Sequence, residues 1–300
     1  MHLAVLSAGA PRHGRAITKQ WQSIADQNGW GWELEFWEWE NGQGYDNRDF
    51  ASVQWAVWIG LFERAFDFML MQSECKHLGV FVGTDLLQHL DLVQRGYPDP
   101  FHAATILAAD APHLVQEAQR LTGREVGYVR SIPPETYQAR PIERWDNILA
   151  YVPTGREDFF RWPWILEVAR DYPDIAFNIL ARQETPKEQT NVVAIPEIQG
   201  AEKRQLFERC FSMLRPIEHD GIGLTMIEMA QMGRFVFHSD TRIPHVLPAR
   251  SVGEMEFHLD EILRCKRPPN PEISSYYVRE FSEQRLADDV EQLRRRMEDV

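Results

Sequence analysis

The chain has 300 residues, of which 44% are hydrophobic and 26% charged, and its formal net charge is −13. This length corresponds to about two domains of roughly 100 to 200 residues, with enough apolar residues for a buried core. The acidic balance argues against a protein that coats nucleic acid or anionic lipid without specificity. No apolar stretch approaches the roughly 20 residues that span a bilayer, and no signal peptide is recognisable, so we expect a cytoplasmic protein without membrane insertion.

Strand-like and helix-like patterns alternate through the first 143 residues. Residues 8–14 are expected to form a loop, and Pro133, Pro134 and Pro141 mark a linker. The sequence predicts strands at residues 2–7, 32–39, 79–82, 104–108 and 126–130, and helices at residues 15–27, 50–69 and 112–121.

The same alternation continues after the linker. Strands are predicted around Leu149 and Ser212 and at residues 175–180, 192–195 and 235–238, and helices at residues 164–170, 201–210 and 224–231. Repeated strand and helix units predict an α/β fold of two Rossmann-like domains with parallel sheets, facing a cleft that holds the ligand. We place the domains at residues 1–143 and 144–277, followed by an amphipathic helix at residues 278–300.

Two acidic residues, Asp220 and Glu228, lie eight positions apart around a glycine turn. Gly221 and Gly223 allow a tight turn with exposed amides, and the helix predicted after them has a partially positive N-terminus. This arrangement suits phosphate, and the two acids suit the hydroxyls of a sugar and a ribose. The pattern therefore suggests a nucleotide sugar. The alternative is a generic turn with Glu228 solvated, and no third glycine completes a dinucleotide fingerprint.

The segment that contains this turn, LRPIEHDGIGLTMIEMAQMGRFV at residues 214–236, resembles the donor-site signature of family-4-type retaining glycosyltransferases with the GT-B fold. That signature has Pro, a few residues, Glu-Gly-x-Gly-Leu, three residues, Glu-Ala and Gly-x-Pro-Val. Here Asp220 replaces the first Glu, and the final proline is missing between Gly233 and Val236. The resemblance implies that Asp220 holds sugar hydroxyls and Glu228 the ribose. It implies a donor site that also includes His219, Gly221, Ile222, Gly223, Leu224 and Thr225. For His219 the alternative is a purely structural role beside the turn.

A second match follows the strand predicted around Leu149. Thr154-Gly155-Arg156 comes directly after it, and Arg161 lies five residues further on. The family has Gly-Arg and then a Lys at these places, and both cations contact the donor diphosphate. Arg161 would stand for that Lys and would offer a bidentate fork to phosphate. The alternative is that both arginines are surface charges near the start of a helix.

The resemblance assigns the acceptor to the first domain, where the motifs are less specific. It places the loop of Gly9 beneath the donor phosphates and the C-terminal helix back on the N-terminal domain. Asp85 follows a predicted strand in Gly83-Thr84-Asp85. Its carboxylate would either act on the acceptor hydroxyl and the anomeric carbon or cap the following helix.

The resemblance also implies a mechanism, that of a retaining hexosyltransferase. The acceptor hydroxyl would attack the face from which the nucleoside diphosphate leaves, and the departing phosphate would take the proton. Arg156, Arg161 and the amides of residues 221–224 would neutralise that phosphate. Neither a metal nor a cofactor is expected besides the nucleotide sugar as co-substrate. The sequence has no Asp-x-Asp motif, and Cys75, Cys210 and Cys265 are widely separated.

The sequence does not decide between four classes of acceptor, which are a soluble glycan, a small molecule, a protein side chain and a hydroxymethylated pyrimidine of viral DNA. Seven of the ten tryptophans lie within residues 21–58, and most of them suit a core, yet such rings also stack on sugars or flipped bases. The net charge argues against the DNA acceptor. Two other classes also remain, a sugar-nucleotide epimerase of the same fold and a noncatalytic nucleotide-sugar-binding protein.

Overall fold

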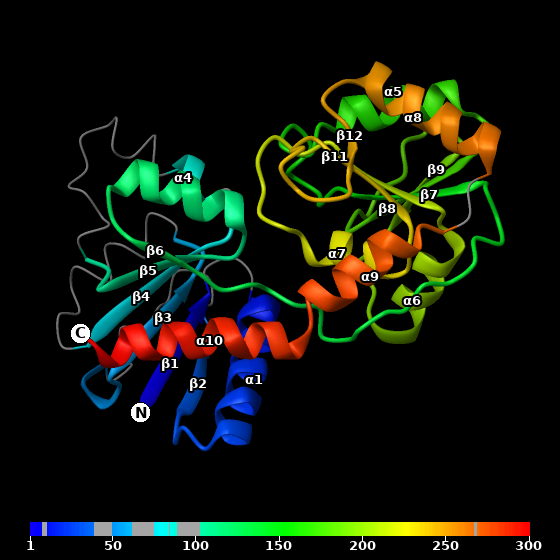
Figure 1. The fold of residues 1–300 in the computed structure, drawn as a ribbon. Coiled ribbons are helices and arrows are strands. Elements are labelled where there is room, and N and C mark those ends of the chain that lie inside the picture. The colour runs from blue at the N-terminus through cyan, green and yellow to red at the C-terminus, as the bar shows by residue number, and fades with distance from the viewer. Residues whose placement is uncertain (8–10, 39–49, 62–74, 84, 89–102, 267–268) are drawn as a thin grey trace. The chain divides into compact units, whose positions relative to one another are not determined.

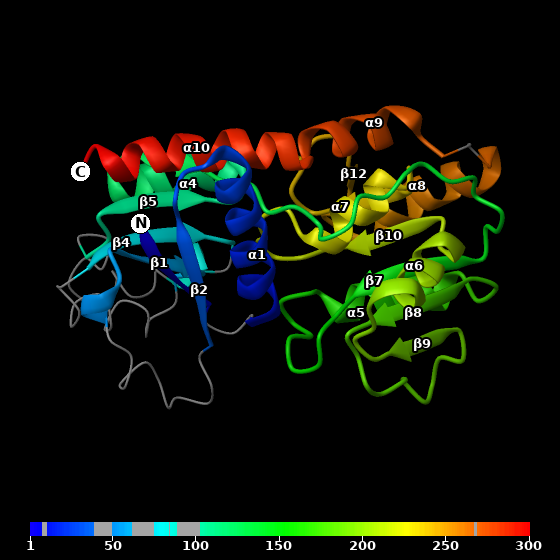
Figure 2. The same ribbon diagram turned by 90° about the horizontal axis from the view of Figure 1, so that it is seen from below.

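The computed structural model divides into two compact units, residues 1–134 with 283–300 and residues 135–282 (Figures 1 and 2). It describes the whole chain except residues 8–10, 39–49, 62–74, 84, 89–102 and 267–268. Both units contain a parallel sheet with flanking helices, so the predicted α/β class with two Rossmann-like domains is confirmed.

The sheet of the first unit has six parallel strands in the order β2-β1-β3-β4-β5-β6. Its central strands are buried on both faces, as is typical of parallel sheets covered by helices. The strands are β1 (His2–Ser7), β2 (Glu33–Glu38), β3 (Trp55–Ile59), β4 (Lys76–Phe81), β5 (Ile106–Ala109) and β6 (Val126–Tyr128).

The helices described in this unit are α1 (Pro11–Asn28), α4 (Pro112–Thr122) and α10 (Glu283–Glu298), with a short 3-10 turn η2 (Phe50–Ser52). The C-terminal helix α10 is joined to the sheet by buried Asp289, which accepts from Nε of Arg130 at 2.6 Å and from the Arg130 backbone N–H at 3.1 Å. Residues from the two ends of the chain thus build one unit.

Two predictions for this unit are wrong. The helix expected at residues 50–69 is contradicted by β3, whose sequence WAVWI is apolar at every position because both of its faces are buried. The first helix begins at Pro11, four residues earlier than expected, and Gly14 lies inside it. A Cβ on Gly14 would be 2.7 Å from that of Ser7, so this glycine allows close packing of α1 on β1.

The sheet of the second unit has six parallel strands in the order β12-β11-β10-β7-β8-β9. Successive strands run outward from β7 in one direction and then from β10 in the other. The switch point of this doubly wound sheet therefore lies between β7 and β10, which are hydrogen-bonded neighbours. The strands are β7 (Asn147–Tyr151), β8 (Ala176–Leu180), β9 (Val192–Ile195), β10 (Ser212–Arg215), β11 (Phe235–His238) and β12 (Leu247–Pro248).

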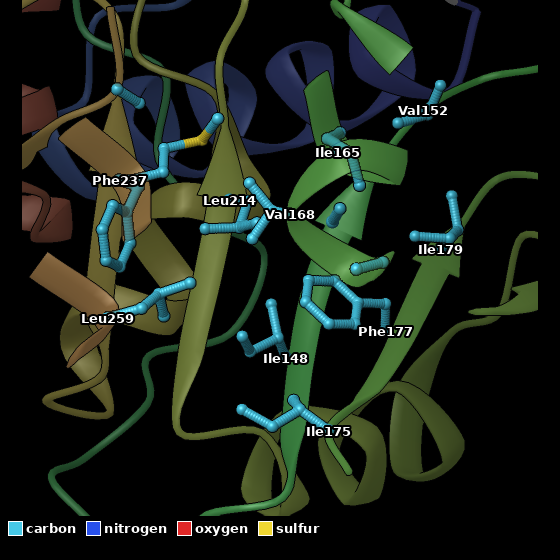
Figure 3. Packing of buried hydrophobic residues seen from close by; sticks show 14 of the residues in the cluster. Ile148, Val152, Ile165, Val168, Ile175, Phe177, Ile179, Leu214, Phe237 and Leu259 are labelled. Carbon is cyan, nitrogen blue, oxygen red and sulfur yellow. The ribbon is translucent and has the colours of Figure 1, made fainter. Parts of the chain in front are cut away.

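The helices of the second unit are α5 (Trp162–Asp171), α6 (Gly200–Arg209), α7 (Leu224–Gln231), α8 (Val252–Cys265) and α9 (Pro271–Glu280). Helices α5 and α8 contribute to one hydrophobic cluster with the strands, in which Ile165, Phe177 and Leu259 are at most 1% exposed (Figure 3). This core fixes the carboxyl ends of β7 and β10, from which the site is built.

The C-terminal segment differs from the single amphipathic helix that the sequence predicts. Of the predicted residues 278–300, residues 283–298 form α10 of the first unit, whereas residues 278–280 are the end of α9 in the second unit, and the two helices are separated at Phe281 and Ser282. Helix α8 and strand β12 were not predicted. None of the helices in the described part of the chain is long and apolar enough to cross a membrane.

Candidate functional site

The two loops that carry the sequence motifs leave neighbouring strands at the switch point of the second sheet. Residues 154–161 follow β7 and residues 216–223 follow β10. The backbone N–H of Glu218 donates to the carbonyl of Phe159 at 3.0 Å, which joins the two loops directly. Ligands of doubly wound sheets bind outside the carboxyl ends of the strands at such a switch point. The fold therefore brings the two motifs to the place where a ligand is expected.

Asp220 is bound to Arg215, the last residue of β10. Nε of Arg215 donates to Oδ2 of Asp220 at 2.8 Å, and Nη2 donates to the same oxygen. The Arg215 side chain is 7% exposed and that of Asp220 16%. The guanidinium also lies 5.5 Å from the centre of the Phe160 ring and 5.8 Å from that of Tyr151. Asp220 is thus held as half of a largely buried ion pair.

Gly223 precedes helix α7 and leaves room for that guanidinium. A Cβ at Gly223 would lie 2.8 Å from Nη2 and 2.9 Å from Cζ of Arg215, so a larger residue would displace the arginine. No side chain caps α7, whose first residues Leu224 and Thr225 are half-buried. Because the first amides of a helix lack partners within it, this turn is suited to an anion. Gly221 and Ile222, which belong to this turn, are buried.

Glu228 lies in the middle of α7 and is 1% exposed. Lys203 of α6 donates to its Oε1 at 2.8 Å. The ammonium is also 2.6 Å from Oε2, but that oxygen accepts no hydrogen bond from the residues described. Burial raises the pKa of Glu228, Lys203 opposes the rise and Glu135 adds to it. A buried carboxylate with an open acceptor position can bind a ligand hydroxyl.

Arg156 and Arg161 lie in the loop between β7 and α5. Arg156 is exposed, with Cζ 4.7 Å from the centre of the Phe159 ring. Arg161 precedes α5 in a left-handed conformation with φ of 49°, and its Cζ lies 4.4 Å from the centre of the Trp164 ring. Nε of Arg161 is buried without a hydrogen-bond partner among the described residues. Both guanidinium groups lie over aromatic rings, and neither forms an ion pair within the described part of the chain.

The pKa of Tyr151, at the end of β7, is affected by charged residues of both loops. Burial raises the pKa of its phenol; Arg215 and Arg156 lower it, whereas Glu197 and Asp220 raise it. Charges from both motifs therefore act on one side chain. His219, beside Asp220, is half-buried.

In the first unit, Asp85 is fully buried and surrounded by backbone donors. Its carboxylate accepts from the amides of Leu61 at 2.9 Å, Gly83 at 2.9 Å, Val82 at 3.1 Å and Leu86 at 3.2 Å. Burial raises the pKa of Asp85 to about 6, and these four amides oppose the rise. Only the Leu86 amide belongs to the helix that follows, so the carboxylate mainly orders the backbone of residues 61, 82 and 83, which is neither the acceptor role nor the helix cap expected from the sequence. Gly9, expected beneath the phosphates, lies outside the described residues.

Two side chains of the site were not identified from the sequence. Arg215 lies inside the recognised segment, at a position where the resemblance assigns no role. Lys203 is 25 residues before Glu228 and belongs to no motif.

Arg234 lies next to Phe235, the position at which the family signature has proline. It is fully buried and donates to the carbonyls of Arg140, Pro141 and Glu208. Its role is to hold the linker against the second unit. Among the residues that the structure describes, no group of three or more His, Cys, Asp or Glu could hold a metal.

Two doubly wound units, each with a parallel sheet, make up the GT-B fold of glycosyltransferases, and solved structures of that fold superpose on the chain. Sucrose-phosphate synthase from Thermosynechococcus elongatus matches with a TM-score of 0.71 and 10% identity, over 99% of both chains. The lipopolysaccharide outer core galactosyltransferase WaaB matches with a TM-score of 0.65 and 10% identity, over 97% of this chain and 98% of the other.

A third structure is an alpha-glucosyltransferase in complex with UDP and a 13-mer DNA. It matches with a TM-score of 0.53 and 8% identity, over 97% of this chain and 95% of the other. No protein-family model matches the chain, and no curated protein matches it in sequence. These comparisons establish the GT-B fold.

Proposed function

We propose that the protein is a glycosyltransferase that uses a nucleoside-diphosphate sugar and transfers the sugar to an acceptor hydroxyl. The observation that carries the proposal is the junction of the two motif loops at the switch point, where Glu218 bonds to Phe159. That junction puts a glycine turn at a helix N-terminus and an arginine-bearing loop on adjacent strands. A diphosphate is the ligand that matches helix amides and guanidinium groups together.

Each residue of the site has a proposed role in donor binding. Arg156, Arg161 and the amides of residues 221–224 hold the diphosphate and stabilise the charge on it as the bond to the sugar breaks. Asp220 holds sugar hydroxyls, with His219 beside it. Glu228, with Lys203 fixing one of its oxygens, accepts hydrogen bonds from the ribose. Asp85 is a positioning residue for the loops of the first unit.

In this scheme the reaction retains the anomeric configuration and proceeds without a metal. The acceptor oxygen bonds to the anomeric carbon on the face from which the nucleoside diphosphate departs. The departing phosphate takes the hydroxyl proton, so the products are a glycoside and the protonated diphosphate. The protein's contribution is the positioning of both substrates and the neutralisation of the leaving group.

For the acceptor we retain a soluble glycan or small molecule and, second, a hydroxymethylated pyrimidine in DNA. The DNA acceptor is retained because one structure with this fold, the alpha-glucosyltransferase, is a complex with UDP and a 13-mer DNA. The net charge of −13 favours the smaller, uncharged acceptors for this chain.

Donor binding is tested by calorimetric titration of the protein with UDP, GDP and ADP and with UDP-glucose. We expect one nucleoside diphosphate to bind with a dissociation constant in the micromolar range and Arg156→Ala with Arg161→Met to weaken it at least tenfold. Glu228→Gln should weaken UDP and uridine alike, since both contain the ribose. If none of the diphosphates binds, or if Glu228→Gln leaves binding unchanged, the donor site is assigned wrongly.

Transfer is tested with a radiolabelled donor and separate pools of oligosaccharides, small alcohols, protein and hydroxymethylated DNA. A labelled glycoside in one pool supports the proposal, and its anomeric configuration tests retention. Conversion of the sugar nucleotide without any acceptor would indicate an epimerase instead. Saturable binding with neither transfer nor hydrolysis would indicate a nucleotide-sugar-binding protein.

A further inference from the structure

Arg215 has a position that the donor-binding scheme does not explain. It ends β10 at the switch point, and its side chain, which is 7% exposed, contacts Asp220 and Phe160 of the two motif loops and Tyr151 at the end of β7. It binds Asp220, packs near the rings of Tyr151 and Phe160, and occupies the space beside Gly223. A buried guanidinium thus lies directly behind the turn where the diphosphate is proposed to bind.

The charge balance of this turn gives the arginine a function. Asp220 brings a carboxylate to the same turn whose amides are suited to phosphate. A diphosphate carries two or three negative charges, and an uncompensated carboxylate beside it would repel it in a partly desolvated site. The ion pair with Arg215 makes the net charge of the two side chains zero.

We propose that Arg215 is a positioning residue that neutralises Asp220 and fixes its carboxylate, so that an acid able to hold sugar hydroxyls can stand beside a diphosphate. This inference rests on the proposed donor site and deepens it. The pair thus contributes to the selectivity for phosphate-bearing ligands, because the Arg215 guanidinium offsets the negative charge of Asp220 beside them. The cost of removing Arg215 should therefore fall on the binding of the diphosphate and not on that of the nucleoside.

Three variants separate this role from the alternatives: Arg215→Leu, Asp220→Asn and the double variant. UDP binding is measured by calorimetry, and uridine binding by competition in ligand-observed NMR. Arg215→Leu should weaken UDP about 10- to 100-fold and change uridine less than about threefold. Asp220→Asn alone should leave UDP binding equal or tighter. The double variant should regain UDP binding to within about threefold of the wild type, because the opposing charge is gone.

Other outcomes overturn the inference. If the double variant binds UDP as weakly as Arg215→Leu, the guanidinium contacts the phosphate itself. If Arg215→Leu weakens uridine as much as UDP and Asp220→Asn does not restore either, the arginine has only a structural role. Should Arg215→Leu not fold, Arg215→Gln replaces it in the same cycle. Failure of the wild-type protein to bind any nucleoside diphosphate would refute the proposed donor site, a result that is separate from the comparison of variants.

Discussion

The ammonium nitrogen of Lys203 lies 2.6 Å from Oε2 of Glu228 and donates to Oε1 at 2.8 Å, joining α6 to the buried face of α7. Glu228 is 1% exposed and Lys203 20%. A charge this deeply buried is tolerated in a folded protein when it is paired. The pair therefore maintains a carboxylate at the centre of a helix whose other buried side chains, apart from Gln231, are apolar. It also orients that carboxylate for a ligand.

The first prediction concerns this pair. Lys203→Met should lower the free energy of unfolding by about 2 to 3 kcal/mol, because it leaves the Glu228 carboxylate buried without a cation. Glu228→Gln should cost less, and the double variant should be more stable than Lys203→Met. Urea denaturation of the three variants measures these differences. Additive effects of the two substitutions would show that the pair is not coupled.

The second prediction concerns Gly223, where the structure leaves no room for a side chain. Gly223→Ala should destabilise the protein by about 1 to 2 kcal/mol and weaken UDP binding, because its methyl group would displace the Arg215 guanidinium. Gly253→Ala is the matched control. It lies inside α8 with nothing within 4 Å of the added Cβ, and we expect it to stabilise by about 0.5 to 1 kcal/mol. Equal thermal shifts of the two variants would contradict the packing at Gly223.

A third prediction concerns the attachment of α10 to the first unit. Asp289 accepts both backbone and side-chain bonds from Arg130, and their side chains are 7% and 9% exposed. Asp289→Ala should lower the free energy of unfolding by about 3 kcal/mol, since it leaves the buried guanidinium unpaired. Its neighbour Asp288 is exposed, and Asp288→Ala should change stability by less than about 0.5 kcal/mol. Hydrogen exchange should show α10 unprotected in the first variant alone.

The fourth prediction is a pH dependence from Asp85. Its pKa is raised from 3.8 to about 6, so the folded state binds a proton more tightly than the unfolded state. The resulting stabilisation is complete below about pH 3.8 and is lost as the pH rises through about 6. At about 1.4 kcal/mol per pH unit, the loss is roughly 3 kcal/mol. Asp85→Asn has no such titration.

The measurement is the free energy of unfolding of the wild type minus that of Asp85→Asn, followed from pH 3.5 to pH 7.5. This difference should decrease with increasing pH and level off above the folded pKa. A difference that stays constant or increases over this interval would show that Asp85 is not held as the structure describes.

Local sequence was sufficient to predict the bounds of a helix or strand where its pattern is compatible with one kind of element only. The helix at residues 224–231 and the strand at residues 235–238 were predicted with the bounds of α7 and β11. When a glycine turn is followed by an apolar segment that is not rich in β-branched residues, the segment usually begins a helix. By contrast, WAVWI at residues 55–59 fits a buried helix as well as a central strand, and only the neighbours β1 and β4 decide between them.

The partners of the acidic residues could not be predicted in the same way. Lys203 of α6 reaches Glu228 of α7 across 25 intervening positions of the sequence, and no spacing in the sequence encodes that contact. Arg215 and Asp220 are only five residues apart, yet their pairing depends on how the loop after β10 turns back over the strand end. A sequence motif specifies which acidic and basic side chains are present, whereas their burial in the folded protein decides which acids need a cationic partner.

Most of the strands and helices, apart from β3, α8 and β12, follow from the amino-acid sequence, as do the glycine turn with its two acids and the arginines after β7, because periodicity and turn chemistry act between near neighbours. The return of the C-terminal helix to the first unit was implied by the family resemblance, whereas only the tertiary structure shows the hydrogen bond between the β7 and β10 loops and the partners of Asp220, Glu228 and Asp85. Such contacts join residues that a parallel sheet brings together across intervening crossovers. Their energies depend on desolvation, which has no local signature in the sequence.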